Sequence, residues 1–143
     1  MRDSVFVDTN VFIYAYTAKD PEKHEIASKL LKERLAGTSI FISTQILNEF
    51  YSAMGKNKVA HKEILRYIAE IIRCANVTSV SLGTVESCLK LKERYEYSYW
   101  DSLLLAAALD CGCNILYSED MQHSQVIDKR LTIINPFKEA EKS

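Results

Sequence analysis

Short apolar runs alternate with longer amphipathic stretches along most of this chain. The stretches between the runs carry apolar residues at helical spacing, and no hairpin turn joins one run to the next. The runs that predict strands are Ser4–Val7, Ile40–Ile42, Val77–Val80, Ile115–Tyr117 and Leu131–Ile134. This alternation predicts the α/β class, as a three-layer α/β/α sandwich with a mostly parallel central sheet.

Helix start and stop signals divide the amphipathic stretches. Asp20 and Pro21 are a capping residue and a first-turn proline, so a helix begins there, and Gly37 can end it. Ser98 can open the most apolar helix, whose centre is Leu103–Leu109. The other predicted helices are Val11–Tyr16, a helix after Ser43 or Thr44, His61–Ala75 and Thr84–Tyr95.

Four acidic residues lie far apart in the chain but near the ends of predicted elements. Asp8 follows the first strand, and Asp120 comes three residues after Tyr117. The carboxyl ends of parallel strands share one rim of the sheet, so these two should meet. Glu49 lies about two turns into its helix, and its side chain tilts back toward the same rim. Asp101 lies in the first turn of its helix, but simple alternation does not fix which rim that turn occupies.

Carboxylates that converge without basic partners repel one another. A pair about 4 Å apart costs roughly 4 kcal/mol at an effective dielectric near 20. Each acid has a structural explanation when taken alone: Asp8 and Asp120 can be caps, Ser98 and Asp101 match a capping box, and Glu49 can be a solvated helix residue. Their combination is what predicts a site for a divalent cation.

Composition narrows the class of protein. A chain of 143 residues is the size of one domain, and we expect a single domain over residues 1–137 with a charged tail at 138–143. The net charge of −1 gives no general basic coat for a polyanion. No apolar stretch is long enough to span a bilayer. Four cysteines without a C-x-x-C pair indicate buried free thiols and a reducing cytoplasm.

Four motifs appear in the order typical of one family. They are V-D-T-N-V-F-I-Y at Val7–Tyr14, T-Q-I-L-N-E-F at Thr44–Phe50, S-Y-W-D-S-L-L-L-A-A-A-L at Ser98–Leu109, and I-L-Y-S-E-D at Ile115–Asp120. Together they resemble the PIN-domain ribonucleases, and within these the VapC-type toxins of toxin–antitoxin pairs. The resemblance runs from Ser4 to Phe137.

This resemblance implies an activity, a cofactor and partners. It implies a metal-dependent endoribonuclease that leaves a 5′-phosphate and a 3′-hydroxyl, acts in the cytoplasm, forms a homodimer and binds an antitoxin protein. Mg²⁺ or Mn²⁺ would be held by Asp8, Glu49, Asp101 and Asp120, and the resemblance places Asp101 with the others. Residues expected to support these acids are Asn10, Ser118 and Glu119, of which Glu119 could replace Asp120 as a ligand.

RNA would have to be attracted locally. One basic run is a candidate for this contact: Lys56, Lys58, Lys62 and Arg66. A second run is Lys90, Lys92 and Arg94, although solvated helix faces have the same composition. The aromatic residues Tyr95, Tyr97, Tyr99 and Trp100 could stack on bases or pack in a core or dimer interface.

Two other classes of protein fit parts of the pattern. A noncatalytic RNA-binding or scaffold module would share the fold but would not depend on the acids. A phosphoaspartate phosphatase or receiver would use Asp8 as a nucleophile. In the phosphatase pattern a second aspartate would stand where this chain has Asn10, and no suitably placed lysine follows a strand.

Overall fold

The computed structural model describes residues 3–37 and 39–138. Residues 139–143, most of the predicted tail, therefore lie outside the described part of the chain. The elements in chain order are β1 (Ser4–Val7), α1 (Thr9–Tyr16), α2 (Pro21–Gly37), β2 (Ser39–Ser43), α3 (Thr44–Lys56), α4 (His61–Cys74), β3 (Asn76–Thr78), α5 (Leu82–Tyr95), α6 (Tyr99–Asp110), β4 (Ile115–Tyr117), β5 (Val126–Ile127) and β6 (Leu131–Ile134).

The described strands form one mixed sheet with the order β3-β2-β1-β4-β6-β5. β1 pairs in parallel with β2 on one side and with β4 on the other, and β6 is parallel to β4. The mostly parallel sheet is confirmed. β5 was not predicted, and its antiparallel hairpin with β6 contradicts the expectation of a sheet without hairpins. A strand of two residues is too short to show an alternating pattern.

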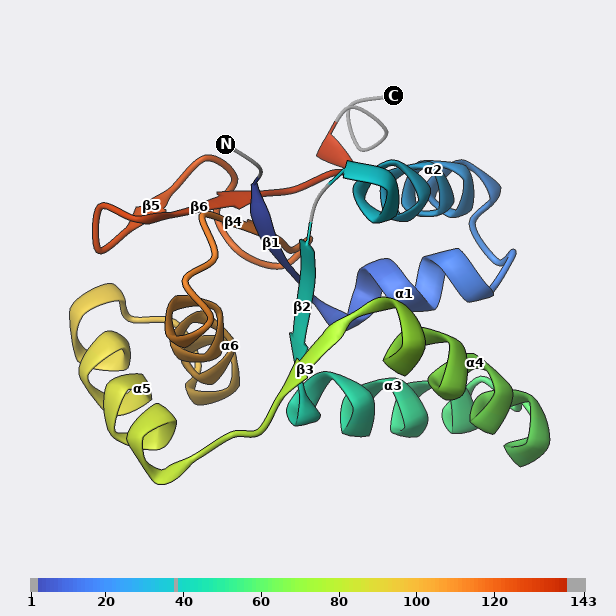
Figure 1. Cartoon of the computed structure of the whole chain (residues 1–143), viewed down its shortest axis with the longest axis horizontal. Coiled ribbons are helices and arrows are strands. Elements are labelled where there is room, and N and C mark those ends of the chain that lie inside the picture. The colour runs from blue at the N-terminus through green and yellow to red at the C-terminus, as the bar shows by residue number, and fades with distance from the viewer. Residues whose placement is uncertain (1–2, 38, 139–143) are drawn as a thin grey trace.

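Helices cover the sheet on both sides, so the three-layer architecture is also confirmed. In Figure 1, α1 to α4 gather on one side of β1 and β2, and the α5–α6 pair lies on the other. The β1 residues Val5, Phe6 and Val7 are buried, as expected for a central parallel strand. In α6 the whole run from Ser102 to Ala108 is buried, which explains why this helix is apolar on every face.

Side-chain caps decide several boundaries that periodicity placed a few residues away. α1 begins at Thr9, not Val11, because Asp8 caps it directly. α5 begins at Leu82, not Thr84, because Ser81 and Thr84 form a capping box in which each backbone N–H donates to the other's hydroxyl at 3.2 Å. The predicted cap at Asp20 is present, since the backbone N–H of Lys23 donates to its carboxylate at 3.1 Å.

The strand order determines where a ligand can enter. From β1 the chain turns to β2 and β3 in one direction and later returns to β4 and β6 in the other. In open α/β sheets the crevice at such a switch point, outside the carboxyl ends of the strands, is where ligands bind. Here that crevice lies between the ends of β1 and β4, at Asp8 and Ser118.

Two predictions for the chain as a whole concern a membrane-spanning helix and the state of the cysteines. In the described residues no helix has both the length and the apolar character needed to cross a membrane. The four cysteines are free thiols: Cys88 and Cys113 are buried, Cys111 is half-buried and Cys74 is exposed. The prediction of buried thiols is therefore wrong for Cys74, the exposed last residue of α4.

Candidate active site

A cavity of about 200 Å³ lies at the switch point, between α1, α3, α6 and the segment after β4. Its lining includes all four acids that the sequence predicted to converge: Asp8, Glu49, Asp101 and Asp120. The remaining lining residues are Thr9, Asn10, Ile13, Gln45, Ala53, Trp100 and Leu104. The acids thus share one cavity, and their function as metal ligands stays a prediction.

Asp8 is the buried acid of this set, with a residue exposure of 8%. Its backbone N–H extends the sheet by donating to the Tyr117 carbonyl at 3.0 Å. One carboxylate oxygen accepts from the Thr9 N–H at 2.6 Å, and the other accepts from the Ser118 hydroxyl at 2.9 Å. Asp8 therefore caps α1, which is the structural explanation that the sequence offered for it. Its carboxylate is also held in a fixed position in the lining of the cavity.

The surroundings of Asp8 disfavour its negative charge. The pKa of this carboxyl is raised from 3.8 to about 6, mainly by burial and to a smaller extent by the nearby carboxylates of Glu49 and Asp120. The hydrogen bonds from Ser118 and Thr9 act in the opposite direction but do not cancel these effects. A cation beside Asp8 would remove the penalty.

Glu49 is an exposed residue on α3, but its side chain reaches the rim of the sheet. Its carboxylate accepts a hydrogen bond from the Thr9 hydroxyl at 3.1 Å. The tilt of helical side chains toward the N-terminus, from which this reach was predicted, is consistent with that contact. Thr9 lines the cavity, and sequence reasoning did not include it among the candidate residues, although its place between Asp8 and Asn10 could have suggested it.

Asp101 occupies the first turn of α6, half-buried beside the cavity. The Ser98 hydroxyl accepts from the Asp101 N–H at 3.1 Å, so the capping function of Ser98 is present. Asp101 and Leu104, one turn apart, both face the cavity. The tertiary structure thus settles the placement that alternation of strands and helices left open.

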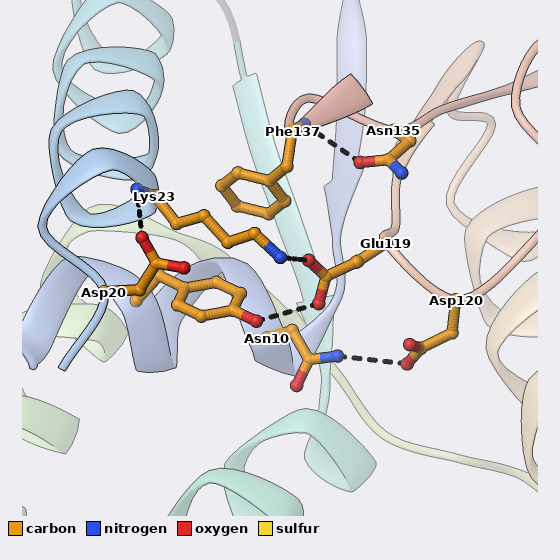
Figure 2. Close-up of polar contacts among 8 residues, drawn as sticks. Asn10, Asp20, Lys23, Glu119, Asp120, Asn135 and Phe137 are labelled. Carbon is orange, nitrogen blue, oxygen red and sulfur yellow. Dashed lines mark hydrogen bonds and ion pairs between the residues drawn. The ribbon is translucent and has the colours of Figure 1, made fainter. Parts of the chain in front are cut away.

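In the segment after β4, the consecutive side chains of Ser118, Glu119 and Asp120 point in different directions. Ser118 is buried and donates to Asp8, while Asp120 is exposed and accepts from the Asn10 amide at 3.0 Å. Figure 2 shows Asp120 turned toward Asn10 and Glu119 turned away, toward α2. Asn10 and Ser118 therefore contact the acids they were expected to support.

Glu119 is held outside the cavity by a cluster that the sequence did not reveal. Its carboxylate forms an ion pair with Lys23 of α2 and accepts from the Tyr14 hydroxyl at 2.9 Å (Figure 2). The Lys23 ammonium also lies 5.1 Å from the Tyr14 ring centroid and 5.6 Å from that of Phe137. Hydrogen bonding to Glu119 raises the pKa of Lys23 to about 12. This geometry disfavours Glu119 as a substitute ligand for Asp120.

The charges that line the cavity are all negative. Among the described side chains of the lining, none is a lysine, arginine or histidine. Carboxylate and amide oxygens are the donors that hard cations such as Mg²⁺ and Mn²⁺ take. The donor chemistry therefore fits a divalent cation. Within residues 3–37 and 39–138, however, no three His, Cys, Asp or Glu side chains are arranged closely enough to hold one together.

The basic candidates for RNA contact lie outside this lining. Lys56 ends α3, Lys58 follows it with a positive φ of 64°, and Lys62 and Arg66 lie on α4. All four are exposed, and Arg66 forms an ion pair with Glu63 at 2.5 Å. Lys56 lies seven residues after Glu49, so it is about 10 Å farther along the same face of α3. Their contact with RNA stays a prediction.

Known proteins share the architecture of this chain. The family model of the PIN domain matches residues 5–129. The solved structure of Mycobacterium tuberculosis VapC20, titled a Sarcin-Ricin loop cleaving toxin, has a TM-score of 0.68 at 20% identity, covering 81% of this chain and 89% of that one. No curated protein matches the sequence.

Two further structures are toxin–antitoxin assemblies. VapBC2 from Rickettsia felis, bound to a DNA fragment from its promoter, matches with a TM-score of 0.67 at 17% identity, covering 92% of this chain and 98% of that one. A toxin–antitoxin complex from Klebsiella pneumoniae matches with a TM-score of 0.67 at 16% identity, covering 92% and 97%. At these identities the likeness shows a shared fold.

Proposed function

Because the chain belongs to the PIN-domain family, we propose that it is a divalent-metal-dependent endoribonuclease and the toxin of a toxin–antitoxin pair. One observation carries this proposal. Four carboxylates line a single cavity at the switch point of the sheet, and none of the described side chains of that lining is basic. Like charges held near one another repel, and a bound cation would relieve that repulsion.

The acids would divide into two pairs. Asp8, fixed by Thr9 and Ser118, and Asp101, in the first turn of a buried helix, would hold Mg²⁺ or Mn²⁺ directly. Glu49 and Asp120 are exposed and would orient water or help to bind a second ion. The bound cation would supply polarisation of a phosphate oxygen and a lowered pKa for a bound water.

The reaction is hydrolysis of an RNA phosphodiester. A water oxygen forms a bond to phosphorus in line with the bond that breaks, between phosphorus and the 3′ oxygen. The leaving oxygen takes a proton and becomes a 3′-hydroxyl, and the phosphate stays on the 5′ side of the next nucleotide. Glu49 and Asp120 line the cavity from α3 and from the segment after β4, and in this proposal they hold the attacking water.

The toxin assignment and its partners rest on the structural neighbours. One of them is a toxin–antitoxin complex and another is VapBC2, so we infer an antitoxin protein as partner. The resemblance to VapC-type toxins adds a homodimer as the working unit, in the cytoplasm. Induced expression should arrest growth, and co-expression of a small gene beside this one should relieve the arrest. Growth that continues unchanged would indicate a nuclease without toxin function.

Nuclease activity can be tested on purified protein. Incubation with structured RNAs in Mg²⁺ or Mn²⁺ should produce fragments with 5′-phosphate ends, whereas EDTA should stop cleavage. Asp8→Asn and Asp101→Asn should each remove it. Glu86→Gln is a matched control, because Glu86 is an exposed acid on α5 outside the cavity. Cleavage that persists in EDTA or in both variants would contradict the proposal, and RNA binding without any cleavage would indicate a noncatalytic module.

A further inference from the structure

Trp100 is the single tryptophan of the chain and is 63% exposed on α6. The three tyrosines near it are engaged within the protein: the Tyr95 and Tyr97 hydroxyls bond to Asp128 and Gln125, and Tyr99 is half-buried, with its ring centroid 5.2 Å from that of the indole. Most of the Trp100 side chain is nevertheless open to solvent. An exposed aromatic side chain of this kind can supply a stacking surface.

A groove of about 470 Å³ lies beside the acidic cavity, and Trp100 forms one of its walls. This volume falls within the roughly 300–1,000 Å³ of small-molecule sites. Thr44, Asn48 and Ser52 of α3 supply polar groups on the opposite wall, and Leu103 lies beside Trp100 on α6. An aromatic face opposite hydrogen-bonding side chains is the lining that a nucleobase requires.

The groove and the cavity share a wall. Gln45, Glu49 and Trp100 line both. On α6 the neighbouring residues diverge, because successive helix positions are about 100° apart: Trp100 and Leu103 face the groove, while Asp101 and Leu104 face the acids. A nucleotide seated in the groove would therefore place its phosphate at the carboxylates.

Unsatisfied polar atoms concentrate at the same place. In the described part of the chain, the buried side-chain atoms without a hydrogen-bond partner are the hydroxyls of Ser43 and Ser102 and Oε1 of Gln45. Ser43 and Gln45 lie at the start of α3, and Ser102 follows Asp101 on α6. Gln45 is 91% buried, and among the described residues its amide has one long hydrogen bond of 3.4 Å, from Nε2 to the Trp100 carbonyl. A side chain so weakly held can turn to meet a base edge.

We propose that this groove binds one unpaired nucleobase of the RNA, next to the phosphate that is cut, by stacking on Trp100. The inference rests on the proposed function and adds a residue that sets the choice of substrate: a base in a duplex is already stacked on its neighbours, so Trp100 receives an unpaired base. A second copy of this chain is the competing occupant. The observation that favours RNA is continuity, since Gln45, Glu49 and Trp100 line both the groove and the cavity that holds the acids.

The single tryptophan makes the test direct. Fluorescence of an Asp8→Asn protein is titrated in Mg²⁺ with a mixed-sequence single-stranded 12-mer and with the same strand in a duplex. We expect saturable quenching by the single strand and at least tenfold weaker quenching by the duplex. Quenching that is absent, or equal for both RNAs, overturns the proposal.

Cleavage supplies the second readout. Stacking predicts that Trp100→Ala lowers kcat/KM about 5- to 150-fold, the loss expected for one stacked base, while Trp100→Phe keeps most of it. Leu89→Ala is the control, because Leu89 is a similarly exposed apolar residue on α5 outside the groove. An alanine variant within twofold of wild type overturns the proposal. The proposal is also overturned if wild type shows no quenching and sediments as a dimer while Trp100→Ala sediments as a monomer.

The two proposals fail in different ways. Quenching is measured without cleavage. A wild-type protein that binds single strands but never cuts them would therefore refute the nuclease proposal and leave the stacking proposal standing. A protein that cuts RNA equally well with and without the indole refutes the stacking site and keeps the nuclease.

Discussion

The two walls of the acidic cavity are built differently. On the wall formed by α1 and the segment after β4, Asp8 accepts two hydrogen bonds, Asp120 accepts one from Asn10, and Glu119 is held by Lys23 and Tyr14. On the wall formed by α3 and α6, Glu49 accepts one hydrogen bond from Thr9, the Gln45 amide has one long bond, and Trp100 is exposed. The first wall is preorganised, and the second has polar groups and an aromatic face still available to a substrate.

The fixed and the adaptable side chains suit different functions. Preorganised carboxylates suit an ion that must be held in fixed geometry, because the cost of bringing them together is met during folding. Adaptable side chains suit a substrate that changes from one molecule to the next. Substitutions of the four acids should therefore affect the rate and the affinity for metal, and those of Gln45 and Trp100 on the second wall should affect recognition.

Asp8→Asn should show the largest effect of any substitution on the first wall. We expect kcat to fall on the order of 10³-fold, since a metal site supplies several kcal/mol of transition-state stabilisation. Asp120→Asn, which changes an exposed acid, should cost about 10- to 100-fold. Rates measured under single-turnover conditions check this order. Equal losses for both variants would mean that burial does not distinguish the two acids.

The same residue should limit the stability of the metal-free protein. The pKa of Asp8 is raised from 3.8 to about 6 in the folded state, so its ionised form destabilises the fold. That cost is absent below about pH 4, grows between pH 4 and 6, and is full above. At 1.36 kcal/mol for each pKa unit it is at most about 3 kcal/mol.

Asp8→Asn should consequently raise the free energy of unfolding in EDTA by about 1–3 kcal/mol at pH 7.5 and leave it unchanged at pH 4. Urea denaturation at the two pH values measures this. Glu86→Gln, an exposed acid on α5, should change neither value. A destabilised Asp8→Asn protein at pH 7.5 would show that its hydrogen bonds outweigh its burial.

Ser118→Ala tests whether the hydroxyl positions Asp8. Loss of a residue that orients a metal ligand typically costs 10- to 100-fold in metal affinity or activity, and we expect a loss in this range. Titration of Mn²⁺ by calorimetry gives the affinity directly. Ser118→Thr keeps the hydroxyl and should recover part of the affinity. Metal binding equal to wild type in Ser118→Ala would assign the hydroxyl to folding alone.

Lys23→Met tests the cluster behind the first wall. The Lys23 and Glu119 side chains are 18% and 13% exposed, so removing one partner leaves a largely buried charge and should cost about 1–3 kcal/mol of stability. The double variant Lys23→Met with Glu119→Gln should recover much of that loss. If the cluster also fixes Asp120, the affinity for Mn²⁺ should fall about threefold in both variants.

Lys56→Gln should have the smallest effect, on recognition. A lysine that contacts one phosphate of a single strand contributes about 0.7 to the slope of log affinity against log salt. We expect this slope to decrease by that amount and kcat to stay unchanged. Lys29→Gln, an exposed lysine on α2 that belongs to neither basic run, is the matched control. An unchanged salt slope for Lys56→Gln would remove α3 from the RNA path.

The sequence by itself determined the elements and the rim where most of the acids lie. The buried run Ser4–Val7 and the caps at Asp8 and Ser98 are local features, written in neighbouring residues. The parallel arrangement followed because helices of sufficient length separate most of the strands. These features predicted the central sheet and the placement of Asp8, and they suggested that of Asp120.

Only the tertiary structure decided the features that depend on residues far apart in the chain. It brought the first turn of α6 to the cavity, paired Lys23 with Glu119 across 96 positions, and formed the β5–β6 hairpin from a run of two residues. It also left Trp100 exposed while its neighbouring tyrosines found partners. Hydrophobic periodicity records which face of an element is buried, but it contains no information about which other element covers that face.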